Sequence, residues 1–205
     1  MDLDHVTFAG PDFDERSPIL DMLPDNLAGL LRQINGFIMY EGGLHVRGVC
    51  LEPSWHSLEN TLIGPSALHK LYPAVEVADV PFAQDCLADQ YLLRARSVCR
   101  LEAETGVVTP LNLSLPEFFR SIQEDPVEFL GMHPLLRHQR EIGSLQPGQV
   151  LHAYPPFCTK QAADGVSLRA VPAGEAILFL ADFARQISGL GEGENFQVTV
   201  TPRDA

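Results

Sequence analysis

The spacing of apolar residues along the chain predicts three amphipathic helices. In residues 23–36 and 113–125, and in the part of 167–188 that begins at Pro172, large apolar side chains recur every three or four positions, which places them on one face of a helix. Pro24, Ser114 and Pro172 stand at or near the starts of these segments, where a first-turn proline or a capping serine is favoured. Residues 53–72 predict two shorter helices, each entered by a serine. Residues 125–143 predict further helix, interrupted at Pro134.

Between the helices, short apolar runs bounded by turn residues predict strands. Two runs flank Gly42 and Gly43, which is typical of a hairpin, and further runs follow between residues 74 and 112, with a turn at 104–106. Because the strands are grouped, they predict an α+β fold with a mostly antiparallel sheet and helices packed on one side. We divide the chain into a loosely held acidic lead (1–22), a single domain (23–190) and a tail (191–205), which is read as a last strand or an ordered end.

The charge of the chain narrows the classes of partner. The net charge is −13, which disfavours nucleic acid and anionic membrane surfaces and permits a basic protein partner. The cysteines, Cys50, Cys86, Cys99 and Cys158, form no C-x-x-C pair and are expected to be reduced. With no basic, apolar leader and no run long enough to span a bilayer, we expect a cytoplasmic protein, monomeric or weakly dimeric.

Catalytic and metal-binding motifs are absent from the sequence. There is no phosphate-binding glycine loop, no nucleophile elbow and no zinc-type histidine spacing, so we expect no cofactor, no metal and no enzymatic activity. Two pairs remain as candidates for a small hydrolase: Asp85 with Asp89 as acid and base, and Cys158 with His152 as nucleophile and base.

Residues 79–93, DVPFAQDCLADQYLL, place carboxylates and amides between segments that resemble buried strands. Three interpretations of Asp85 and Asp89 compete: paired catalysts, side chains that close a turn through backbone N–H groups, or part of an exposed acidic surface at the sheet edge. The lack of any neighbouring nucleophile or metal motif makes catalysis the weakest of them. Turn closure and the exposed surface do not exclude one another.

The same stretch carries a family resemblance. VPFAQDCLADQYLLR, followed by GVVTPLNLSLPEFFRSI, resembles the SUKH superfamily, and LPDNLAGLLRQINGF is similar to that family's entry helix. Ala88 stands where members of the family usually have glycine, so a left-handed turn there would place an alanine in a strained conformation. The tryptophan that often precedes the family's entry helix is also missing.

The resemblance implies a non-enzymatic, cytoplasmic α+β domain that binds another protein. Bacterial members are immunity proteins that neutralise secreted toxins, often type VI effectors, and eukaryotic relatives are regulators of cell-wall (glucan) synthesis and interaction scaffolds. We therefore expect an immunity protein with a basic toxin as its partner, and keep a regulatory scaffold as the alternative.

The expected binding surface lies around the turn. It comprises Phe82, Gln84, Asp85, Asp89 and Gln90, and the carboxylates of Asp12, Asp14 and Glu15 are expected to act as a steering patch. Residues 154–157, Tyr-Pro-Pro-Phe, are a further candidate as an exposed aromatic loop, with packing against the sheet as the alternative.

Overall fold

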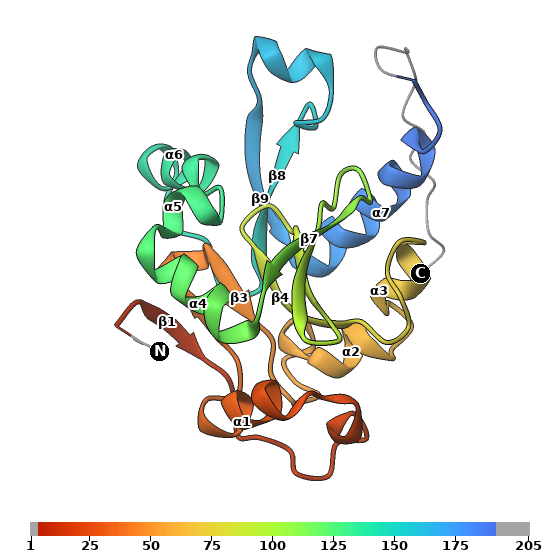
Figure 1. Ribbon diagram of the computed structural model, residues 1–205. Coiled ribbons are helices and arrows are strands. Elements are labelled where there is room, and N and C mark those ends of the chain that lie inside the picture. The colour runs from red at the N-terminus through yellow and green to blue at the C-terminus, as the bar shows by residue number, and fades with distance from the viewer. Residues whose placement is uncertain (1–3, 192–205) are drawn as a thin grey trace.

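The computed structural model describes residues 4–191 and contains one seven-stranded sheet and one two-stranded ribbon. All six strand pairings in the large sheet are antiparallel, and the strands lie side by side in sequence order. They are β1 (Val6–Ala9), β2 (Phe37–Met39), β3 (Leu44–Val46), β4 (Val80–Asp85), β5 (Gln90–Arg94), β6 (Ser97–Leu101) and β7 (Val108–Leu113). The ribbon of β8 (Gln149–Tyr154) and β9 (Ser167–Pro172) projects from the body of the molecule, as Figure 1 shows. The predicted α+β fold with a mostly antiparallel sheet is confirmed.

The helices arise where the apolar period predicts them. They are α1 (Asp25–Gln33), α2 (Leu58–Leu62), α3 (Leu68–Leu71), α4 (Leu115–Glu124), α5 (Pro126–Phe129), α6 (His133–Glu141) and α7 (Ala173–Ile187). Ser114 precedes α4 as predicted, and its backbone N–H donates to Glu117 Oε2 at 2.8 Å. Pro134 does not interrupt a helix: it lies in the first turn of α6, where its missing N–H is not needed. Short 3₁₀ segments occupy 20–22, 40–42, 54–56 and 160–164.

The large sheet has two buried faces, because side chains alternate across each strand. On one face, Tyr91 and Val98 belong to a core that includes residues of α1 and α4. On the other face, their neighbours Leu92 and Cys99 pack in a second cluster with α3 and α7. Helices therefore cover both faces of the sheet, whereas the sequence led us to expect them on one side. The β8–β9 ribbon also packs against the sheet, because Val150 of β8 belongs to the second cluster.

The N-terminal segment is part of the sheet, so the expected loosely held lead is wrong for the described residues. β1 pairs with β2, and Ile19 is fully buried in the core. Asn35 holds the segment after β1 in place, because its side-chain amide donates hydrogen bonds to the carbonyl oxygens of Pro11 and Asp12. The expected last strand or ordered tail lies outside the described residues, apart from Gly191. Among the helices of residues 4–191, none is long and apolar enough to cross a membrane.

Candidate partner-binding site

The turn between β4 and β5 is closed by Asp85. Its Oδ1 atom accepts hydrogen bonds from the backbone N–H groups of Leu87 at 2.9 Å and Asp89 at 3.1 Å. Ala88, whose φ is 69°, adopts the left-handed conformation, which is strained for an alanine. The backbone N–H of Asp85 also donates to the Asp89 carbonyl at 3.0 Å. Turn closure, the second interpretation of these carboxylates, is what the geometry shows.

Arg100 on β6 forms ion pairs with both carboxylates of this turn. Its Nε and Nη2 atoms donate to Asp89 Oδ2 at 3.0 and 2.6 Å, and Nη2 lies 3.7 Å from Asp85 Oδ2. Burial, followed by the charge of Asp89, raises the pKa of Asp85 well above its ordinary value. Burial also raises the pKa of Asp89, against the opposing effect of Arg100. The group is thus a buried cluster of two carboxylates that depends on one guanidinium.

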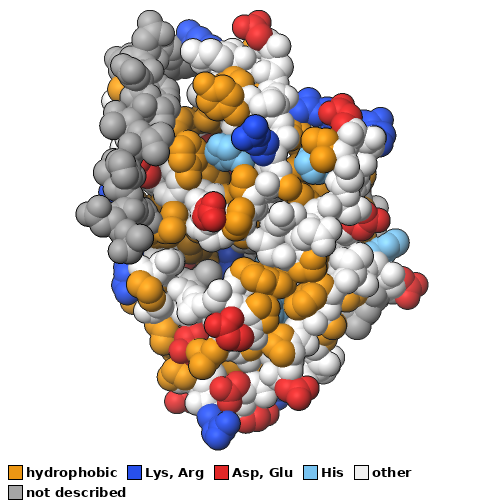
Figure 2. All heavy atoms as spheres, turned by 180° about the vertical axis from the view of Figure 1, so that it is seen from behind, with side chains coloured by type: hydrophobic (Ala, Val, Ile, Leu, Met, Phe, Trp, Pro, Cys, Tyr) orange, Lys and Arg blue, Asp and Glu red, His pale blue; other side chains and the backbone are white. Residues whose placement is uncertain are grey.

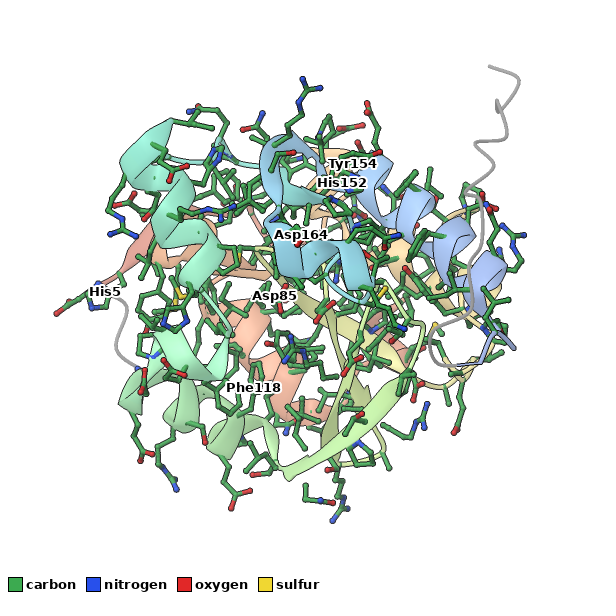
Figure 3. All side chains as sticks on the ribbon, turned by 90° about the horizontal axis from the view of Figure 1, so that it is seen from above. His5, Asp85, Phe118, His152, Tyr154 and Asp164 are labelled. Carbon is green, nitrogen blue, oxygen red and sulfur yellow. The ribbon has the colours of Figure 1, made fainter. Side chains whose placement is uncertain are left out.

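The expected exposed surface at this turn is wrong, because the structure buries the side chains that were to form it. Phe82 and Gln90 are fully buried, and Gln84, Asp85 and Asp89 are at most 9% exposed. In Figure 3, Asp85 lies between Phe118 of α4 and the His152 and Tyr154 side chains of the ribbon. The physical reason is that β8 packs on the turn, where the Leu151 N–H donates a hydrogen bond to the Cys86 carbonyl at 2.7 Å.

The proposed steering carboxylates lie elsewhere. Asp12 and Glu15 are exposed and Asp14 is half-buried, and Glu15 forms an ion pair with Arg32 of α1 at 3.4 Å. Figure 2 shows carboxylate side chains at the end of the molecule where α1 lies in Figure 1. The contacts of this segment include Arg32 of α1, Asn35 and Val49, and they do not join it to the turn.

The β8–β9 ribbon carries the exposed aromatic loop. Tyr154 is 72% exposed and Phe157 is 41% exposed, so these two aromatic side chains are not packed into the sheet. The loop is held in place at its base, because Glu104 accepts hydrogen bonds from the backbone N–H groups of Phe157 at 2.9 Å and Cys158 at 2.8 Å. We call residues 149–172 the arm.

A cleft of about 400 Å³ lies between the arm and the sheet. Its charged side chains are Asp89, Arg100, Glu102 and Glu104, and Phe157 and His152 belong to the arm side. Since Arg100 is paired with Asp89, the uncompensated charge comes from Glu102 and Glu104, and Glu102 is exposed. Burial lowers the pKa of His152, so this side chain adds no positive charge at neutral pH. We call this region the acidic cleft.

The acidic cleft also contains the candidate nucleophile Cys158. Partial burial, followed by the charge of Glu104, raises the pKa of the Cys158 thiol to about 12. A nucleophilic cysteine requires the opposite shift, towards the thiolate. Both oxygens of Asp89 accept hydrogen bonds, from Arg100 and from the Ala103 N–H, and Asp85 Oδ1 accepts two backbone N–H groups. Asp85 Oδ2 is buried, has no hydrogen-bond partner among the described residues and lies 3.7 Å from Arg100. Within residues 4–191, no group of three histidine, cysteine, aspartate or glutamate side chains is placed to hold a metal ion.

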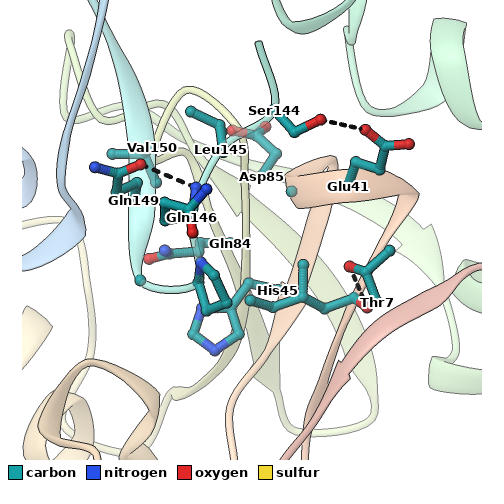
Figure 4. A pocket seen from close by; sticks show the side chains of 14 residues that line it. Thr7, Glu41, His45, Gln84, Asp85, Ser144, Leu145, Gln146, Gln149 and Val150 are labelled. Atoms are coloured by element: carbon teal, nitrogen blue, oxygen red, sulfur yellow. Dashed lines mark hydrogen bonds between the residues drawn. The ribbon is translucent and has the colours of Figure 1, made fainter. Parts of the chain in front are cut away.

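A second cleft, of about 330 Å³, lies on the other side of β8 (Figure 4). His45, Gln84 and Asp85 reach it from β3 and β4, and Gln149 reaches it from β8. Behind it, the ring nitrogens of His45 and His56 lie 2.8 Å apart, and His56 Nε2 donates to the Asn35 carbonyl at 2.9 Å. Burial lowers the pKa of His45 well below its ordinary value, in keeping with this network of neutral rings. This network has no counterpart among the predictions made from the sequence.

Comparison with known proteins supports the fold only. No family model and no curated protein matches the chain. Among solved structures, the chain is similar to the crystal structure of Atu4351 from Agrobacterium tumefaciens, with a TM-score of 0.54 and 15% sequence identity over 87% of this chain and 86% of that one. At this identity, the similarity shows a shared fold.

Proposed function

We propose that this protein is an immunity protein, which binds a secreted toxin through the acidic cleft and the arm and thereby neutralises it. The observation that carries the proposal is the position of an exposed aromatic loop directly beside uncompensated carboxylates. Tyr154 and Phe157 supply rigid contact area, and Glu102 and Glu104 supply negative charge. Aromatic anchors beside complementary charge are typical of protein-binding surfaces.

The charge of the whole chain supports a basic partner. A net charge of −13 produces a long-range field that accelerates encounter with a positively charged protein. A lysine or arginine of the partner would meet Glu102 and Glu104 in the acidic cleft. The resemblance to the SUKH superfamily supports a toxin as that partner, and a regulatory scaffold of the same fold is the alternative.

The proposal is tested with any secreted effector that is encoded beside this gene in its genome of origin. The wild-type chain should form a complex with that effector and suppress its toxicity when the two are co-expressed. Glu102→Lys should weaken binding at least about tenfold, since it places a cation against the partner's cation. The matched control, Glu124→Lys, makes the same change in net charge at an exposed residue of α4 outside the cleft and should alter mainly the association rate.

The arm is tested separately with Tyr154→Ala. The side chain is 72% exposed, so its removal should leave folding stability within about 0.5 kcal/mol of the wild type while weakening the complex about tenfold or more. Absence of a complex with every neighbouring secreted effector would favour the scaffold. A tight complex that tolerates both Glu102→Lys and Tyr154→Ala would instead move the interface to another surface.

A further inference from the structure

Arg47, which directly follows β3, is a buried cation whose hydrogen-bond acceptors are all neutral. The residue is 3% exposed. Its Nη1 donates to the Pro81 carbonyl at 2.9 Å, and its Nη2 donates to the side-chain oxygens of Gln84 at 2.7 Å and Gln90 at 2.6 Å. Its Nε is buried and has no hydrogen-bond partner. A guanidinium has five N–H donors, so donor capacity remains.

Arg47 also has no counter-ion within the described residues, because none of their carboxylates lies within 4.0 Å of it. Buried charges in proteins are normally paired, since an isolated one loses several kcal/mol of hydration without return. Burial accordingly lowers the pKa of Arg47 to about 9. A bound anion would supply the missing charge.

The place for such an anion is a cleft of about 660 Å³ that Arg47 lines. The first turn of α7 lines it too, with Ala173, Gly174 and Glu175. α7 has 15 residues, and its first N–H groups have no acceptor inside the helix, so this end carries positive potential. The half-buried Trp55 contributes an aromatic wall.

We propose that this cleft binds a small organic anion, whose carboxylate or phosphate group meets Arg47 and whose apolar part lies against Trp55 and the buried side chain of Leu68. The volume fits a ligand of ordinary small-molecule size, in a site with apolar walls and a few polar groups. Within residues 4–191, Glu175 is the only carboxylate that lines the cleft, and it is exposed, so it weakens the positive potential without filling the site. The inference stands apart from the proposed function, because the acidic cleft and this one share no lining residue.

Trp55 is the single tryptophan of the chain, so its fluorescence reports directly on this cleft. Benzoate and phenyl phosphate are the probes, one for each anionic group, and benzyl alcohol is the neutral control. With the full chain, we expect saturable changes in Trp55 emission, with dissociation constants on the order of 0.1–1 mM for at least one anion. Benzyl alcohol should bind at least about tenfold more weakly, and added salt should weaken the anions alone.

Three variants assign the binding to named residues. Arg47→Met should weaken anion binding at least about tenfold, with circular dichroism as the check on folding. Gly174→Asp does not depend on replacing a buried residue: a Cβ there meets nothing within 4 Å, and the new carboxylate should weaken binding several-fold. Glu175→Gln should strengthen it, and Glu124→Gln, outside the cleft, should leave it unchanged.

The outcomes that would overturn the inference are equally specific. They are no saturable signal with either anion, equal affinity for benzyl alcohol, or a folded Arg47→Met chain that titrates like the wild type. If Arg47→Met does not fold, unchanged affinity in both Gly174→Asp and Glu175→Gln overturns the inference. None of these results bears on toxin binding, which is measured at the other cleft.

Discussion

Replacing Arg100 by methionine should strongly destabilise the turn between β4 and β5. Arg100 is the cation within reach of two buried carboxylates, at 2.6 Å from Asp89 and 3.7 Å from Asp85. Methionine keeps most of the side-chain volume and removes the charge. Breaking a buried ion pair from one side costs about 3–5 kcal/mol, and the one-third exposure of Arg100 places the expected loss near the lower end, at about 3 kcal/mol.

The loss should depend on pH in a definite direction. The pKa of Asp85 is higher in the folded protein than in the unfolded chain, so protonation of this carboxyl group favours folding. This stabilisation is fully present below the pKa of the unfolded state and is lost as the pH rises through the pKa of the folded state. Without Arg100, both carboxyl pKa values should rise further. If the folded variant retains one proton that the unfolded chain releases, its stability should recover by about 1.4 kcal/mol per pH unit on acidification, or about 2.7 kcal/mol between pH 7.5 and 5.5.

Urea denaturation at these two pH values measures the effect. We expect Arg100→Met to lose less stability, relative to the wild type, at pH 5.5 than at pH 7.5. The double variant Arg100→Met, Asp89→Asn should be more stable than the single variant at pH 7.5, because an amide oxygen can still accept the Ala103 N–H that Asp89 accepts at 2.8 Å. A loss below about 1 kcal/mol that does not change with pH would mean that Arg100 does not hold these carboxylates, and would refute the reasoning.

Three further predictions concern the core, the N-terminal segment and the free thiol. Phe118→Ala should lower the free energy of unfolding by about 3–5 kcal/mol in urea denaturation, because the ring is fully buried; a loss below about 1 kcal/mol would contradict its place in the core. Asn35→Ala should cost about 2–3 kcal/mol and make residues 4–22 sensitive to limited proteolysis, since Val49 N–H loses its acceptor at 2.6 Å; a segment that stays resistant would count against this anchor. At pH 8, Cys158 should react with iodoacetamide more slowly than a model thiol and faster in Glu104→Gln, because the Glu104 charge helps to raise the thiol pKa; equal rates in the two chains would contradict that role.

The parts of the fold that sequence reasoning recovers are those with local causes. Each of α4 and α7 is signalled by the apolar period of its own residues, and α4 also by the serine that precedes it. These signals are local, so no distant contact is needed to predict the two helices. The strands β1 and β9, which the sequence analysis does not predict, owe their structure to partners: β1 pairs with β2 about thirty residues later, and β9 pairs with β8 across the arm. Their sequences mix polar and apolar residues, so neither signals a strand alone.

Closure of the turn by Asp85 is among the interpretations that the sequence supports, whereas the burial of the turn is not, and the two outcomes have one explanation. The positive φ of Ala88 follows from a local motif, whereas the burial of Asp85 and Asp89 depends on Arg100 from the next hairpin and on β8, about sixty residues further along. A carboxylate in a sequence indicates an exposed position unless a cation pairs with it in the folded chain. The burial of this turn is therefore a tertiary property, which the turn sequence does not encode.

A different signal in the sequence points to the acidic cleft. Between residues 99 and 104 the order is Cys-Arg-Leu-Glu-Ala-Glu, in which buried Cys99, Leu101 and Ala103 alternate with three charged residues. Extended chain places alternate side chains on one side, which puts Arg100 and Glu102 on the same side. Glu104 lies in the turn that follows β6, and all three charged residues line the acidic cleft. Arg100 is used internally by Asp89, which leaves Glu102 and Glu104 facing a cleft that the arm borders with Phe157. The negative face expected at the turn is thus built one hairpin later, by the period-two pattern of β6 and the residues that follow it.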